Sequence, residues 1–257
     1  MNVVNGDREA VDTLLGDDRI KAVSFVGSTP IAEYIYATAS ANGKRCQALG
    51  GAKNHAIVMP DADMDNTVNQ LLGAAFGSSG ERCMALSVAV AVGDAAGDAL
   101  IGKMKAAMSG LKVGPYSDPE NDFGPVITRQ HQQKIIDHID HAEQQGAKIV
   151  VDGRYPKVAG HEHGFYIGGT LIDRVTPDMD SYNAEIFGPV LQVMRVDTMQ
   201  AAMDLIDAHE YGNGTCIFTR DGEAARYFSD HIQVGMVGIN IPPVSYTHLT
   251  LPTILLV

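Results

Sequence analysis

The spacing of apolar residues switches between two periods along the chain. Helical spacing, with apolar positions three and four residues apart, is found over residues 7–16, 28–43, 64–77, 129–146 and 199–212. Between these segments lie short runs of strand-forming residues, at 21–27, 44–49, 56–63, 87–94, 148–153 and 214–219, and a further helix and strand end at residue 240. This alternation predicts an α/β fold with a mostly parallel sheet.

Composition narrows the class of function. A chain of 257 residues, 45% of them hydrophobic, can form one large domain or two smaller ones. The formal net charge of −12 disfavours nucleic acid and anionic membranes as partners, because both bind basic surfaces. No apolar run approaches the roughly 20 residues of a membrane-spanning helix. We therefore expect a small-molecule substrate, with no nucleic-acid and no membrane partner.

Cysteine and histidine usage indicates neither disulfides nor a metal site. The three cysteines, Cys46, Cys83 and Cys216, form no CxxC pair, which fits a reducing compartment such as the cytoplasm. Four histidines occur in short clusters that lack a third ligand at metal-binding spacing: His138, His141, His161 and His163. They are interpreted as surface residues, and no metal is expected.

Cys83 lies in the stretch GSSGERCMA, where a glycine-rich turn and Arg82 precede it. A thiol that attacks a carbonyl must be open to substrate and available as thiolate, and a neighbouring cation favours the thiolate. The alternative is a packed core thiol, since free cysteine is among the most buried residue types. Cys46 and Cys216, each inside an expected strand, are interpreted as structural.

Two further stretches have the character of a binding site. In FVGST, Gly27, Ser28 and Thr29 follow a strand and open a helix, so backbone N–H groups and the Ser28 hydroxyl could hold a pyrophosphate. A plain helix cap needs the same residues, and the motif is not the GxGxxG fingerprint. In EIFGPV, Glu185 could accept hydrogen bonds from a ribose and Phe187 could pack against a nicotinamide ring, although a strand entrance needs no such role.

Together these stretches resemble the aldehyde dehydrogenase superfamily, and GAKNH, NTVNQLLGAAFGSSGERCMA and YGNGTCIFT resemble its coenzyme A-acylating methylmalonate-semialdehyde branch. The resemblance implies Cys83 as the nucleophile whose backbone N–H helps to hold the oxyanion, and NAD as the hydride acceptor. It further implies Arg82 as a fork for the carboxylate of malonate or methylmalonate semialdehyde, with a plain surface arginine as the alternative. The branch acts in valine and pyrimidine breakdown.

The resemblance also places Leu49 at the position of a catalytic base in hydrolytic members of the superfamily. Hydrolytic members carry a glutamate in an LELGGK-like segment that activates the deacylating water, and alignment with GAKNH puts Leu49 at that position of the cofactor site. Without this base, coenzyme A is the expected acyl acceptor, because a thiol is appreciably ionised near neutral pH. The expected products are acetyl-CoA or propionyl-CoA after loss of carbon dioxide. A hydrolytic aldehyde dehydrogenase and a non-catalytic dinucleotide-binding relative are the alternatives.

The expected organisation follows that of the family. Residues 1–50 would be the later part of a Rossmann-type cofactor domain, 51–244 the α/β catalytic domain, and 245–257 a tail foreign to the family. We expect the chain to be part of a longer enzyme, a homotetramer or homodimer in the cytoplasm, or in the mitochondrial matrix of a eukaryote.

Overall fold

The computed structural model describes residues 2–243, and these form two compact units that divide after Gly51. We call them unit 1 and unit 2 and describe each by itself. The domain roles assigned from the sequence stay a prediction, and the expected tail at 245–257 lies outside the described residues.

Unit 1 alternates helix and strand as the apolar spacing predicts. It contains α1 (Arg8–Gly16), β1 (Ala22–Val26), α2 (Thr29–Ala41) and β2 (Arg45–Leu49), with β1 and β2 paired in parallel. Leu15, Ile35 and Ala39 form its buried apolar cluster, and Cys46 packs against them. The helix signals of α2 are confirmed, because Pro30 lies in its first turn and Gly43, at φ +67°, follows its end.

Unit 2 is built on one seven-stranded sheet. Its strands lie in the order β5 (Lys148–Val151), β6 (Thr170–Asp173), β7 (Val190–Val196), β4 (Leu86–Val92), β3 (Asn54–Val58), β8 (Gly214–Phe218) and β9 (Met236–Ile239). Every neighbouring pair is parallel except β5 with β6, which confirms the mostly parallel α/β sheet. The central strands β3 and β8 are buried along their whole length.

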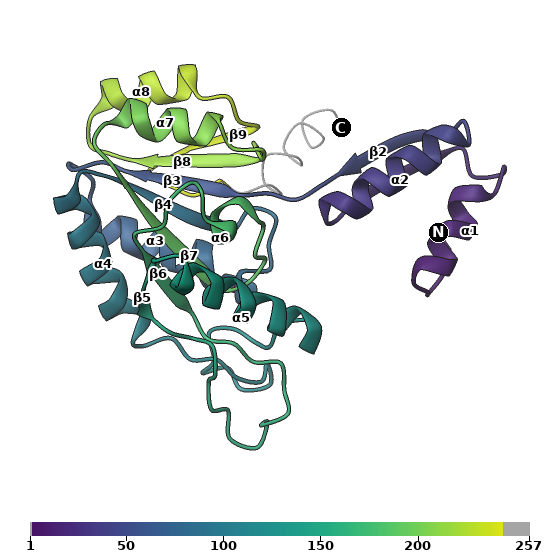
Figure 1. The fold of residues 1–257 in the computed structure, drawn as a ribbon, viewed down its shortest axis with the longest axis horizontal. Coiled ribbons are helices and arrows are strands. Elements are labelled where there is room, and N and C mark those ends of the chain that lie inside the picture. Colours follow the sequence, from purple (N-terminus) through teal and green to yellow (C-terminus); the bar gives the residue numbers. More distant parts are fainter. Residues whose placement is uncertain (1, 244–257) are drawn as a thin grey trace, which may run out of the picture. The chain divides into compact units, whose positions relative to one another are not determined.

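Helices cover both faces of this sheet (Figure 1). One buried cluster joins it to α3 (Met64–Phe76) and α4 (Asp94–Met108). The opposite cluster joins it to α5 (Arg129–Gln144), α7 (Met199–Asp207) and α8 (Gly222–His231). A short helix, α6 (Asp180–Asn183), precedes β7. The arrangement is a three-layer α/β unit.

The structure departs from the sequence-based expectation at several points. Helices α4 and α6 and strands β6 and β7 were not assigned from the apolar pattern. Strand β3 begins at Asn54, two residues earlier than expected, and ends at Val58 because Met59 to Ala62 form a turn. Of the four clustered histidines, three are exposed as predicted, whereas His138 is half-buried on α5, where burial lowers its pKa to about 4.

Candidate active site

Cys83 lies on a short loop between α3 and β4. The 3₁₀ turn η1 (Gly77–Gly80) follows α3, and its last three residues have left-handed backbone angles: Ser78 (φ +53°), Ser79 (φ +57°) and Gly80 (φ +67°). Such angles are uncommon outside glycine, and two successive serines there mark a strained turn. The chain then carries Cys83 to an exposed position, whereas Cys216 is fully buried and Cys46 is partly buried. The exposure excludes the packed-core alternative for Cys83.

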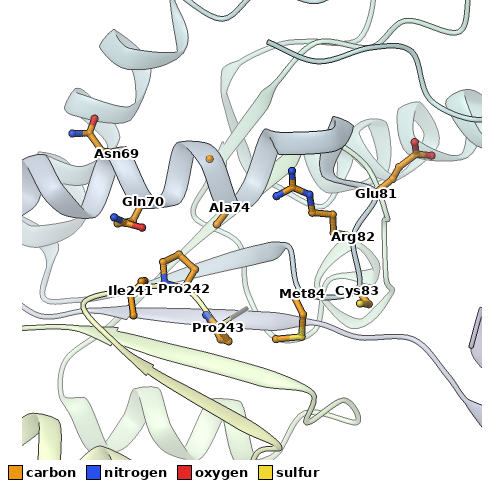
Figure 2. A pocket seen from close by; sticks show the side chains of 11 residues that line it. Asn69, Gln70, Ala74, Glu81, Arg82, Cys83, Met84, Ile241, Pro242 and Pro243 are labelled. Carbon is orange, nitrogen blue, oxygen red and sulfur yellow. The ribbon is translucent and has the colours of Figure 1, made fainter. Parts of the chain in front are cut away.

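A cavity of about 740 Å³ lies beside Cys83. Its wall is formed by α3, by the Cys83 loop and by the segment after β9: Asn69, Gln70, Gly73, Ala74, Glu81, Arg82, Cys83, Met84, Ile241, Pro242 and Pro243. In Figure 2 the guanidinium of Arg82 is directed toward the end of α3, and Met84 is directed toward Pro243. The volume falls in the range of small-molecule sites.

Arg82 is held at the edge of this cavity through one atom. Its Nε donates to the Ser78 hydroxyl at 3.1 Å. The guanidinium passes so close to Gly77 that a Cβ at that position would lie 2.8 Å from one terminal nitrogen. Within residues 2–243 the terminal nitrogens make no ion pair. The cavity therefore has a cationic fork with donors available to a carboxylate.

Residues Ala52 to Asn54 brace the loops around Cys83 and Glu185. The Ala52 N–H donates to Glu185 Oε1 at 3.0 Å. Asn54 Nδ2 donates to the carbonyl of Cys83 at 2.8 Å. The first bond starts two residues before β3 and the second starts from its first residue, so the entrance of this strand connects to both loops. Burial raises the pKa of Glu185, and the Ala52 bond and the Lys53 charge oppose that rise.

Lys53 is the most unusual side chain of this region. It is 1% exposed, and its Nζ donates to the carbonyls of Ser181 and Ala184 at 2.8 Å each. These carbonyls lie on α6 and on the residue before Glu185. Burial lowers the pKa of Lys53 to about 7, and the charge of Glu185 opposes the change.

The first turn of α5 contacts both loops. His131 Nε2 lies 2.6 Å from the carbonyl of Phe187 and 3.5 Å from Glu81 Oε1. Phe187 has φ +56° and is 38% exposed. Burial raises the pKa of Glu81, while the N–H of Ile127 and the charge of His131 act in the opposite direction. His131 therefore connects the Cys83 loop to the loop that carries Glu185 and Phe187.

The pyrophosphate stretch lies in unit 1. Ser28 is the N-cap of α2 and is exposed, but its hydroxyl makes no capping hydrogen bond. Thr29 Oγ1 instead accepts the N–H of Gly51, and the N–H of Gly27 donates to the carbonyl of Leu49 at 3.1 Å. Leu49 ends β2 with 51% of its surface exposed. The residues brought together here are thus Gly27, Ser28, Thr29 and Leu49, whereas Arg82, Cys83, Glu185 and Phe187 belong to unit 2.

Sequence reasoning assigned no role to Lys53, Asn54 or His131, although Lys53 and Asn54 lie in the GAKNH stretch. A lysine and an asparagine followed by the apolar run of β3 were a usable signal, because polar residues at the entrance of a buried strand need partners. Nothing local distinguished His131 from its helical neighbours. In the described part of the chain no three His, Cys, Asp or Glu side chains are grouped as a metal site, and no described helix is long and apolar enough to cross a membrane.

Comparison with known proteins gives concordant results. The model of the aldehyde dehydrogenase family matches residues 1–252. A malonate-semialdehyde dehydrogenase of Pseudomonas aeruginosa is 61% identical over 249 residues, which are 96% of this chain and 50% of that protein. The chain thus spans about half the length of this relative.

Solved structures agree in fold. A methylmalonate-semialdehyde dehydrogenase from Oceanimonas doudoroffii superposes with a TM-score of 0.93 at 83% identity, over 96% of this chain and 51% of that one. A candidate methylmalonate-semialdehyde dehydrogenase from Sinorhizobium meliloti, complexed with NAD, gives 0.91 at 56% identity, over 95% and 50%. Together with the exposed thiol, its arginine neighbour and the α/β sheet, these matches show that the chain belongs to the aldehyde dehydrogenase family.

Proposed function

We propose that this chain is part of an NAD-dependent, coenzyme A-acylating dehydrogenase of malonate or methylmalonate semialdehyde. The observation that carries the proposal is the pairing of exposed Cys83 with Arg82 at one cavity of about 740 Å³. A thiol supplies the nucleophile for an aldehyde, and the adjacent guanidinium supplies the recognition of a substrate carboxylate. The names of the relatives reported above describe this same substrate class.

Cys83 performs the covalent step. Its thiolate adds to the aldehyde carbon and gives a tetrahedral thiohemiacetal, whose oxyanion the Cys83 N–H would stabilise. Loss of the aldehyde hydrogen as hydride leaves an acyl thioester on Cys83. A second thiolate, that of coenzyme A, then attacks the acyl carbon and displaces Cys83. Cleavage of the bond between the substrate carboxylate and its α-carbon releases carbon dioxide and leaves a thioester enolate. Protonation of this enolate at carbon completes the acyl group, so the products are acetyl-CoA or propionyl-CoA.

The residues of unit 1 fit a dinucleotide. The exposed Ser28 hydroxyl is not used to cap α2, and the N-terminus of this 13-residue helix favours an anion. Gly27, Ser28 and Thr29 would hold the pyrophosphate, while Glu185 and Phe187 would contact the ribose and the nicotinamide. Bound NAD supplies the acceptor for the hydride.

Leu49 favours transfer to coenzyme A over hydrolysis. An aliphatic side chain at the position of the hydrolytic glutamate cannot take a proton from water. Water is a weak nucleophile without such a base, whereas a thiolate needs none. The acyl enzyme is therefore expected to persist until a thiol attacks its acyl carbon.

The proposal extends to the setting of the complete enzyme. We infer a homodimer or homotetramer that acts on a small-molecule semialdehyde in the cytoplasm, or in the mitochondrial matrix of a eukaryote. Size-exclusion chromatography with light scattering on the complete enzyme tests the assembly.

The decisive experiment is rapid mixing of the complete enzyme with NAD and semialdehyde. Without coenzyme A we expect a burst of about one NADH per site and then slow turnover, because the thioester persists. Added coenzyme A should restore steady cycling, and Cys83→Ala should remove the burst but retain NAD binding. Steady release of free acid at full rate without coenzyme A would move the assignment to the hydrolytic branch. Activity in Cys83→Ala would overturn the nucleophile.

A further inference from the structure

Two side-chain amides converge on the backbone carbonyl of Cys83. Asn54 Nδ2 donates to it at 2.8 Å, and Asn213 Nδ2 donates to it at 3.0 Å. Asn54 opens β3, and Asn213 directly precedes β8, its paired neighbour. The same two amides also reach the residues that follow, because Asn54 Nδ2 lies 2.9 Å from the carbonyl of Ala85 and Asn213 Nδ2 lies 3.0 Å from Met84 Sδ.

We propose that Asn54 and Asn213 act together as positioning residues for the Cys83 nucleophile. The inference rests on the proposed function, since it needs Cys83 to be the attacking group. A carbonyl oxygen has two lone pairs, and here each can meet one amide. Fixing this carbonyl fixes the backbone torsion between the Cys83 Cα and its carbonyl carbon, and with it the direction in which the thiol leaves the backbone.

The loop needs such an external anchor because its own structure supplies little. Between η1 and β4, the backbone bonds within the loop are a Glu81 N–H to the Ser78 carbonyl at 3.0 Å and an Ala85 N–H to the Arg82 carbonyl at 3.1 Å. Neither bond involves Cys83. A displacement of about 1 Å between reacting groups can cost about 100-fold in rate, so an unanchored Cys83 would lose much of its reactivity.

Asn54 has an energetic cost that its donor role offsets. The side chain is 1% exposed, and its Oδ1 has no hydrogen-bond partner among the described residues. A buried, unsatisfied carbonyl destabilises the folded state, so an apolar residue of similar shape would be favoured if only stability mattered at this position. The amide instead donates two hydrogen bonds to the loop of Cys83, one to the carbonyl of Cys83 and one to that of Ala85.

The test compares amide-deleting variants of the complete enzyme. Asn213→Ala removes a partly exposed side chain. Asn54→Leu keeps the number and branching of the side-chain heavy atoms while deleting both the donor and the unpaired oxygen. We expect each to slow the NADH burst by about 10-fold, with the Kd of NAD unchanged and the thermal midpoint not lowered. Asn121→Ala, which deletes a loop amide bonded to the Pro115 carbonyl at 3.1 Å, is the matched control and should burst at the wild-type rate.

The double variant tests whether the amides act together. Each single variant leaves one donor on the carbonyl, whereas the double variant leaves none, so its loss should exceed the product of the single losses. Losses that simply multiply, wild-type bursts in both single variants, or slow bursts that accompany lower thermal midpoints and weaker NAD binding would each overturn the inference. If Cys83→Ala is inactive while the asparagine variants are unaffected, the inference alone fails. Activity in Cys83→Ala defeats the proposed function itself.

Discussion

Gly80 and Gly188 approach each other so closely that a Cβ on Gly80 would lie 2.1 Å from the carbonyl oxygen of Gly188. Gly80 belongs to the turn before Cys83, and Gly188 belongs to the loop of Glu185 and Phe187. Gly80 also has φ +67°, where a side chain is strained. The glycines of GSSGERC and EIFGPV therefore allow direct backbone contact between the two loops that the sequence marks as functional.

The contact predicts a large effect of Gly80→Ala. The added methyl overlaps backbone atoms that have no side-chain freedom to yield, so we expect a loss of at least about 2 kcal/mol of stability. Displacement of the Cys83 loop should also lower kcat/KM at least about 10-fold. Gly102→Ala is the control, because Gly102 lies exposed within α4 with open space around its Cβ position.

Thermal unfolding and NADH formation by the complete enzyme measure both effects. Gly102→Ala should gain about 0.5–1 kcal/mol from helix propensity and keep its activity. Equal stability and activity of the two variants would show that the Gly80 turn has room for a side chain.

Local patterns sufficed for the elements of unit 1 and for the central strands of the sheet, because their apolar periods are regular and their ends carry caps or glycines. They failed at α4, where the stretch around Gly97 and Gly102 weakens the helical signal, and at β6, whose four buried residues TLID show no alternation of apolar and polar positions. The candidate site was predictable where one stretch carries the chemistry, as at Cys83. The contacts of Lys53 with α6 and of Asn213 with Cys83 join segments far apart in sequence, so only the fold reveals them.

Arg82 should determine preference for an acidic substrate. Arg82→Ala removes a cation whose terminal nitrogens are available at the cavity, and hydrogen bonds to charged groups contribute about 1.5–3 kcal/mol. We therefore expect kcat/KM for malonate semialdehyde to fall by about 10- to 150-fold. Propanal, which lacks the carboxylate, should be oxidised within a few-fold of the wild-type rate.

The matched control for Arg82 is Arg220→Ala, which removes an exposed arginine paired with Asp63 at 3.3 Å. Steady-state kinetics with both aldehydes gives, for each variant, the ratio of kcat/KM for malonate semialdehyde to kcat/KM for propanal. A parallel fall for propanal and semialdehyde would assign Arg82 to loop structure rather than to carboxylate binding.

Lys53 should make stability depend on pH. Its folded-state pKa is lowered from 10.5 to about 7, so between these values the unfolded chain binds a proton that the folded protein has released. Stability should therefore rise with pH through this window, by up to about 1.4 kcal/mol per pH unit, and this contribution should be flat below pH 7. The neutral amine retains two N–H donors for the carbonyls of Ser181 and Ala184.

Lys53→Met removes the titration and keeps most of the buried volume. The thermal midpoint of the wild type, relative to this variant, should increase from pH 7 to pH 9.5. A constant difference between the two proteins across that range would show that Lys53 remains charged in its buried position.

Leu49→Glu tests why an aliphatic residue stands where hydrolytic relatives keep a base. Leu49 is 51% exposed at the end of β2, so unit 1 offers room for a longer polar side chain without burying its charge. A carboxylate there should activate water and raise coenzyme A-independent turnover by about 10- to 100-fold, below the upper limit for an evolved general base. The NADH burst should remain near one per site, because thioester formation on Cys83 precedes deacylation.

The control is Leu49→Gln, because glutamine has nearly the same size as glutamate and is also polar but cannot act as a base. This variant should leave the slow phase of turnover unchanged. Equal acceleration by glutamine and glutamate would attribute the effect to hydration of the site, and no acceleration by glutamate would mean that Leu49 does not occupy the position of the base.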